Sequence, residues 1–85
     1  MPEISRFFGI VVWMVYRDHN PPHFHAAYGE QEVSVTILDG SIDGRMSKRA
    51  LRLVQEWRRL HKDELMANWL RARDRRPLEP IPPLE

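Results

Sequence analysis

The chain has 85 residues, a formal net charge of +1 at pH 7 and no cysteine. A chain of this length builds only one small hydrophobic core, so we expect a single domain. The lack of cysteine excludes disulfides, thiolate metal sites and a cysteine nucleophile, so that any metal would have to be held by histidine and carboxylate groups.

The small net charge conceals two halves of opposite sign. Residues 1–44 contain two basic and six acidic residues, whereas residues 45–76 contain eleven basic and four acidic residues. The sequence does not begin with the basic patch, apolar run and cleavage site of a secretion signal. Its longest apolar run, Ile10 to Tyr16, is too short for a membrane-spanning helix. We therefore expect a cytoplasmic protein that does not enter the membrane.

Phe7 to Tyr16 is rich in β-branched and aromatic residues and predicts a first strand covered on both faces. Gly9 interrupts this run and marks either a bulge or a close approach of another group. The next stretch, Arg17 to Pro22, combines aspartate and asparagine with two consecutive prolines, which predict a stiff turn.

Two alternating segments, His23 to Tyr28 and Gln31 to Leu38, flank Gly29-Glu30 and predict a hairpin with a two-residue turn. Its register places apolar side chains on one face and polar side chains on the other. The pairs predicted on the polar face are His23 with Thr36, His25 with Ser34 and Ala27 with Glu32. The two histidines should therefore project side by side from the face of the sheet that no helix covers.

A second two-residue turn is predicted at Asp39-Gly40. Counting outward from it places Ile42 beside Ile37 and Asp43 beside Thr36. Both hairpins then belong to one small antiparallel sheet of three to four strands.

Two helices are predicted after the strands. The first runs from about Lys48 to His61 behind Ser47 as N-cap, and the second continues to about Arg76, where Pro77 stops it. An antiparallel sheet with one apolar face needs a cover, so we expect an α+β fold of order ββββαα with both helices packed on one face. Residues 1–76 form the predicted domain, and residues 77–85 a loosely ordered, extended Pro-rich tail.

Three of the four histidines, His19, His23 and His25, lie within seven residues and pose the main functional question. They could act as general base and acid in a phosphodiester cleavage. With the carboxylate of Asp18 they could instead hold zinc or another divalent ion, although the His-x-His spacing alone is a weak signal. The third interpretation is structural, with the histidines and Asn20 bonding turn amides and neighbouring strands. The sequence therefore predicts no cofactor; a metal, if bound, would use His19, His23 and His25.

Other residues could bind a substrate or partner around the histidines. Arg17, Thr36 and Asp43 are expected near them, and four basic residues form a band at the first helix, namely Arg45, Lys48, Arg49 and Arg52. Such a band could contact the phosphates of RNA or DNA, or could be an ordinary charged helix surface.

Three stretches, MPEISRFFGI, DHNPPHFHAAYG and RALRLVQEW followed by NW, resemble a small bacterial family known as the domain of unknown function numbered four-one-six-zero. The resemblance covers nearly the whole chain, and its most specific part is HNPPHFH. One departure is Arg17, which stands where relatives often look acidic or polar; this cation disfavours a metal and favours a phosphate.

The resemblance implies no established activity, but it implies a second small protein encoded nearby, in an arrangement that looks like a toxin–antitoxin pair. We therefore expect an interaction module of such a pair and a candidate for its toxin, with that cognate protein as partner. The alternatives are a histidine-dependent ribonuclease or phosphodiesterase and a non-catalytic nucleic-acid-binding regulator. Whether the chain is an enzyme, and its oligomeric state, stay open.

Overall fold

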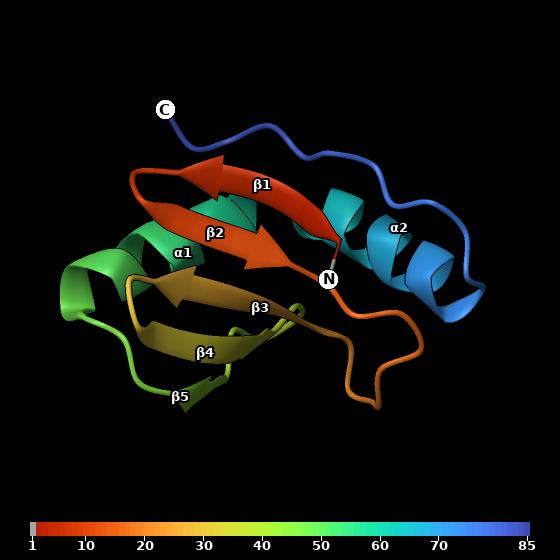
Figure 1. Cartoon of the computed structure of the whole chain (residues 1–85), viewed down its shortest axis with the longest axis horizontal. Coiled ribbons are helices and arrows are strands. Elements are labelled where there is room, and N and C mark those ends of the chain that lie inside the picture. The colour runs from red at the N-terminus through yellow and green to blue at the C-terminus, as the bar shows by residue number, and fades with distance from the viewer. Residues whose placement is uncertain (1) are drawn as a thin grey trace.

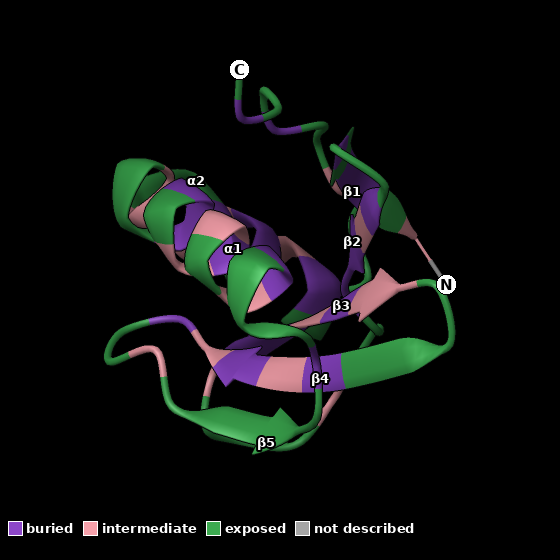
Figure 2. Ribbon diagram, turned by 90° about the vertical axis from the view of Figure 1, so that its left-hand side faces the viewer, coloured by how far each residue is buried: buried purple, intermediate pink, exposed green. Residues whose placement is uncertain are grey.

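The computed structural model describes residues 2–85 and shows five strands followed by two helices. The elements are β1 (Glu3–Phe7), β2 (Ile10–Trp13), β3 (His23–Tyr28), β4 (Gln31–Thr36), β5 (Ile42–Gly44), α1 (Lys48–Leu60) and α2 (Lys62–Arg73). The strands form one antiparallel sheet in chain order, and both helices lie on one face of it (Figures 1 and 2). The α+β class is confirmed, but the sheet has five strands where three to four were expected.

The extra strand comes from the apolar run at the start of the chain. The expected single strand from Phe7 to Tyr16 is instead a hairpin, in which Phe7 of β1 pairs with Ile10 of β2. Phe8 and Gly9 form its two-residue turn with positive φ angles of 47° and 82°. This backbone conformation is easy for glycine and uncommon for phenylalanine, which is why the apolar run concealed a turn.

The register of the central hairpin is confirmed, since His23 pairs with Thr36 and His25 with Ser34. The register of the last hairpin was wrong by two residues, because Asp43 pairs with Ser34 and not with Thr36. The turn is longer than two residues: the N–H of Gly40 donates to the carbonyl of Thr36 at 2.9 Å. A shift of two residues keeps each side chain on its predicted face.

Both helices bury an apolar stripe against the sheet (Figure 2). Ser47 caps α1 as expected, with its Oγ accepting the N–H of Ala50 at 3.2 Å. Trp57 of α1 is fully buried, and its ring centroid lies 5.4 Å from that of Phe7 and 5.6 Å from that of Phe24. No helix within residues 2–85 is long and apolar enough to cross a membrane.

Residues 77–85 are extended and lie against the core, where a loosely ordered tail was expected. Figure 1 shows this segment running alongside β1. The N–H of Ile81 donates to the carbonyl of Ile4 at 2.8 Å, and the indole N–H of Trp57 donates to the carbonyl of Pro82 at 2.9 Å. Ile81 and Leu84 are both buried. The tail thus covers one edge of the sheet, while β5 forms the other edge.

Candidate functional site

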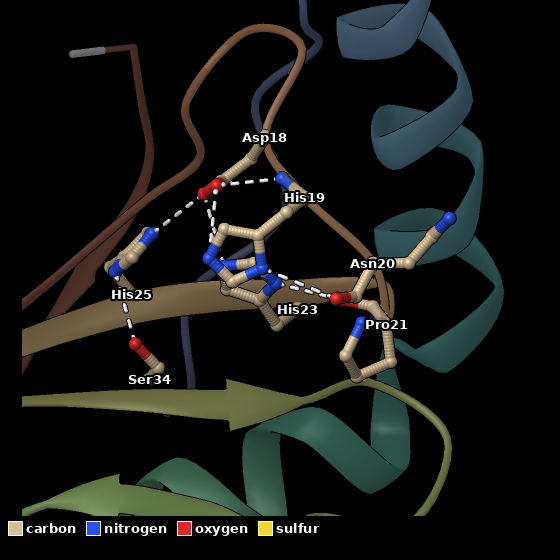
Figure 3. A network of polar contacts seen from close by, with 7 residues as sticks. All are labelled: Asp18, His19, Asn20, Pro21, His23, His25 and Ser34. Atoms are coloured by element: carbon tan, nitrogen blue, oxygen red, sulfur yellow. Dashed lines mark hydrogen bonds and ion pairs between the residues drawn. The ribbon is translucent and has the colours of Figure 1, made fainter.

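The loop between β2 and β3 brings Asp18 to the start of β3. Arg17 adopts a positive φ of 55°, and its backbone N–H donates to the carbonyl of Ala72 at 3.3 Å, which ties the loop to the end of α2. The two prolines that follow hold the backbone on its way into β3. As a result the carboxylate of Asp18 faces the side chains of His23 and His25 (Figure 3).

Asp18 is the common neighbour of all three histidines of the motif. Its Oδ2 lies 3.0 Å from Nε2 of His23 and 3.2 Å from Nε2 of His25. Its Oδ1 accepts the backbone N–H of His19 at 2.9 Å and lies 3.7 Å from Nε2 of the same residue. Three imidazole rings therefore present the same ring nitrogen to one carboxylate.

The second nitrogen of each of the two inner rings has a partner of its own. Nδ1 of His23 lies 2.8 Å from the carbonyl of Pro21, and Nδ1 of His25 lies 3.4 Å from Oγ of Ser34. A carbonyl oxygen can only accept, so Nδ1 of His23 carries the proton. In a neutral ring Nε2 would then be a bare acceptor, placed 3.0 Å from a carboxylate oxygen. A positive charge, either a second proton or a metal ion, has to lie between these two atoms.

The ionisation of Asp18 reflects the same surroundings. Partial burial of the carboxyl raises its pKa, but the backbone hydrogen bond from His19, the side-chain bond with His25 and the positive charge available on His23 and His19 together outweigh this. The pKa of Asp18 is therefore lowered from its ordinary value of 3.8. The carboxylate is negatively charged throughout the physiological pH range.

Two tryptophans form the walls of the cluster. His25 stacks on Trp13 with ring centroids 5.5 Å apart, and His23 packs against Trp69 of α2 at 5.3 Å. The two imidazoles lie side by side as expected, with centroids 5.1 Å apart. The expectation that both lie on an uncovered face was wrong for His23, which is only 6% exposed because Trp69 covers it. This packing fixes the orientation of the ring.

A surface pocket of about 270 Å³ opens beside the cluster. Its lining combines the acid and the three histidines with hydroxyl groups and one further carboxylate, from Asp18, His19, Pro21, His23, His25, Ser34, Thr36, Ser41, Ile42 and Asp43. The lining, all of it in the described part of the chain, contains no lysine or arginine. The pocket is therefore suited to cations and neutral polar groups more than to phosphates.

The structure brings together some of the residues that the sequence suggested and leaves others apart. Thr36 and Asp43 line the pocket, whereas the side chain of Asn20 does not, although its carbonyl lies 3.2 Å from Nδ1 of His19. Arg17 lines a different hollow with Tyr16 and Arg75. The basic band on α1 and the segment before it lies outside the pocket lining, and its four members, Arg45, Lys48, Arg49 and Arg52, are all exposed.

Sequence reasoning did not single out three residues of the site. Ser34 was predicted as the strand partner of His25 on the polar face, which was a usable signal for its contact with that ring, but it was given no role in the site. Trp13 lies in the predicted first strand and Trp69 in the predicted second helix, and neither was linked to the histidines. Both are buried, but they also hold the imidazoles, and no local pattern distinguishes these two uses of tryptophan.

Comparison with known proteins identifies the family of the chain but no activity. The family model described as "Domain of unknown function (DUF4160)" matches residues 9–70, which is most of the chain and includes the whole Asp–His cluster. The search of curated proteins and the search of solved structures each found no match.

Proposed function

Because the chain belongs to the DUF4160 family, whose description names no activity, we propose its function from the site itself: it binds one divalent transition-metal ion, zinc in the first place, through Asp18, His23 and His25. These residues offer one carboxylate oxygen and two imidazole nitrogens, all within 4.8 Å of one another. The chain has no cysteine, so this nitrogen and oxygen set is the kind of site it can build.

The observation that carries the proposal is the pair of atoms on His23. Nδ1 donates to the carbonyl of Pro21, which leaves Nε2 as the free donor atom facing Asp18. Histidines that bind metals nearly always donate their other N–H to a carbonyl, a carboxylate or water, because this fixes the tautomer and the ring orientation. Nδ1 of His25 lies 3.4 Å from Oγ of Ser34, and because a hydroxyl can accept as well as donate, this ring can adopt the same tautomer.

The spacing of the ligand atoms also suits a metal. Two ligand atoms about 2.0–2.1 Å from a tetrahedral zinc are about 3.3 Å apart. The distances from Oδ2 of Asp18 to the two Nε2 atoms are 3.0 and 3.2 Å. The two Nε2 atoms lie within 4.8 Å of each other, so admitting the ion requires the two rings to adjust around Asp18.

Three protein ligands leave a coordination position for water or a substrate. All three ligands line the pocket, so this position opens onto it. Metal sites of this open kind lower the pKa of a bound water and polarise carbonyl or phosphoryl groups. The chain's own contribution is to hold the ligands by packing His23 and His25 on tryptophans and by bonding their outer nitrogens.

Zinc titration of chelator-treated protein tests the proposal. We expect one zinc per chain by calorimetry and by metal analysis after gel filtration. His23→Ala and His25→Ala should each weaken binding at least tenfold. His61→Ala is the matched control, because Nδ1 of His61 pairs with Glu64 at 2.6 Å outside the cluster. If wild-type protein binds zinc no more tightly than both cluster variants do, the site is an imidazolium–carboxylate pair and the proposal is wrong.

The geometry favours metal binding over a metal-free histidine ribonuclease. In that mechanism one ring takes a proton from the substrate and the other gives one to the leaving group. Here the Nε2 atoms of His23 and His25 both point at Asp18, and the described pocket lining offers no lysine or arginine for the phosphate. The nucleic-acid-binding alternative rests on the exposed basic band of α1 and stays a prediction.

We also propose, from the family resemblance, that the chain works with a cognate small protein in a toxin–antitoxin-like module. One observation favours a protein partner: β5 is an edge strand of the sheet, and the apolar side chains of Ile42 in this strand and of Leu38 in the turn before it are 38% and 59% exposed. Such an edge can pair with a strand of another protein. Growth arrest on expression, relieved by the neighbouring protein, supports the toxin role; normal growth and no complex on co-expression contradict the module.

A further inference from the structure

His19 resembles the two inner histidines in one respect and differs from them in another. Its Nδ1 lies 3.2 Å from a backbone carbonyl, that of Asn20, so Nε2 is again the free atom. That Nε2 faces Asp18 at 3.7 Å, and the ring lies 5.2 Å from the ring of His23. In contrast to the inner rings, however, the side chain of His19 is 84% exposed.

Nδ1 of each imidazole has a partner, a carbonyl for His19 and His23 and the Ser34 hydroxyl for His25, and each Nε2 faces Asp18. Two of the rings pack on tryptophans, whereas the third is mostly exposed to solvent. The backbone N–H of His19 is bonded to Oδ1 of Asp18, which keeps the residue next to the carboxylate whatever its ring does. The ligand atoms that lie within 4.8 Å of one another belong to Asp18, His23 and His25 and not to His19, so coordination by His19 needs its exposed side chain to rotate toward them.

From this we propose that His19 is a fourth, exchangeable ligand of the metal bound by Asp18, His23 and His25. The inference rests on the proposed metal binding and adds a control over the open position. With His19 coordinated, the ion has four protein ligands and is closed, as in structural zinc sites. With His19 turned away, the position faces the pocket and accepts water or a small anion.

We expect His19 to exchange because it is packed less tightly than His23 and His25. The side chains of His23 and His25 are only 6% and 17% exposed, and moving them would disrupt packing against Trp13 and Trp69. His19 makes no aromatic contact except with His23 among the described residues, so releasing it costs little. A metal with the Asp18 carboxylate carries a net charge of +1, so an anion is the natural competitor for its place.

The absorption spectrum of the full-length His19→Cys variant loaded with cobalt(II) tests whether the side chain at position 19 reaches the ion. The natural chain has no cysteine, so a thiolate-to-cobalt charge-transfer band in His19→Cys can come only from position 19. We expect that band in His19→Cys and none in a Ser41→Cys control, which places a thiol elsewhere on the pocket lining. The band reports coordination itself, which a merely structural role of His19 would not produce.

A second arm measures exchange with azide as the probe. Azide can bind only when His19 is not coordinated, so its apparent affinity is proportional to the fraction of open sites. If the wild-type site is closed nine-tenths of the time, His19→Ala should bind azide roughly tenfold more tightly than wild type. His19→Ala should also weaken cobalt affinity, by roughly tenfold.

The outcomes separate the two proposals. If wild-type protein binds no cobalt or zinc, the proposed function fails and the inference fails with it. If wild-type protein binds the metal, but His19→Cys shows no charge-transfer band and His19→Ala leaves metal and azide affinity unchanged, only the role of His19 is overturned. A band together with tighter azide binding in His19→Ala establishes the exchange.

Discussion

Nε2 of His23 lies 3.0 Å from Oδ2 of Asp18 while Nδ1 of the same ring donates to the carbonyl of Pro21 at 2.8 Å. A neutral imidazole cannot satisfy both contacts, because it has one N–H and one lone pair. The pair of contacts therefore requires a cation at this point. The nearly complete burial of His23 makes this requirement stronger than it would be for an exposed ring, since solvent screens the two acceptors less.

Removing the charge of Asp18 should remove most of the metal affinity. Asp18→Asn keeps the size of the side chain but replaces the carboxylate that both inner imidazoles face. We expect zinc affinity, measured by competition with a chromophoric chelator, to fall roughly 100-fold. Asp43→Asn is the matched control, since Asp43 is the other carboxylate of the pocket lining. Equal losses in the two variants would show that pocket charge, not coordination, sets the affinity.

Zinc should stabilise the folded chain, because the three ligands come together only after folding. At a free zinc concentration of 100 times the dissociation constant, linkage raises the free energy of unfolding by about 2.7 kcal/mol. For a chain of this size this raises Tm by about 10–20 °C, measured by circular dichroism. The shift should vanish with EDTA and in His25→Ala. A Tm that does not respond to zinc at any concentration would contradict a folded-state site.

The lowered pKa of Asp18 gives the metal-free protein a defined dependence on pH. Because the folded pKa lies below the unfolded value of 3.8, the carboxylate contributes stability above that value and loses it as the pH falls through the folded pKa. Urea unfolding of metal-free protein between pH 6 and 3 should therefore show a steeper acid loss in wild type than in Asp18→Asn. Identical slopes would mean that the contacts of Asp18 do not persist in solution.

The docked tail should contribute to stability through Ile81. This side chain is 4% exposed, and its backbone N–H bonds to the carbonyl of Ile4. We expect Ile81→Ala to lower the free energy of unfolding by about 2–4 kcal/mol, as for other buried aliphatic truncations. Leu60→Ala, at a position 64% exposed, should change it by less than about 0.5 kcal/mol. Similar small effects of both, by chemical denaturation, would indicate a tail that is loose in solution.

The sequence predicted those parts of the fold that follow from short periodic patterns. Alternation around Gly29-Glu30 was enough to fix the pairing of His23 with Thr36 and of His25 with Ser34. Turns were predicted less well, because Phe8 occupies a positive-φ position that its residue type does not signal. The turn at Asp39-Gly40 is closed by the bond from Gly40 to Thr36 and by Asp39 accepting the N–H of Ser41, neither of which the dipeptide alone specifies.

The sequence predicted which residues of the site lie near one another, but not how their side chains are oriented. The β3 spacing placed His23 and His25 together, but the position of Asp18 depends on a loop without periodicity that is anchored to α2 by Arg17. The contact that covers His23 comes from Trp69 of α2, 46 residues further along the chain. It depends on how α2 packs against the sheet, which no local sequence pattern specifies. These two relations turn a weak His-x-His signal into three converging ligands.

Imidazole nitrogen NMR on labelled protein, recorded without metal and with one equivalent of zinc, tests the central claim most directly. We predict that zinc leaves Nδ1 of His23 and His25 protonated and shifts their Nε2 resonances to the position of metal-bound nitrogen, while those of His61 do not change. Spectra in which the His23 ring keeps both protons after zinc is added, with no shift of either inner Nε2, would contradict a metal site at Asp18, His23 and His25.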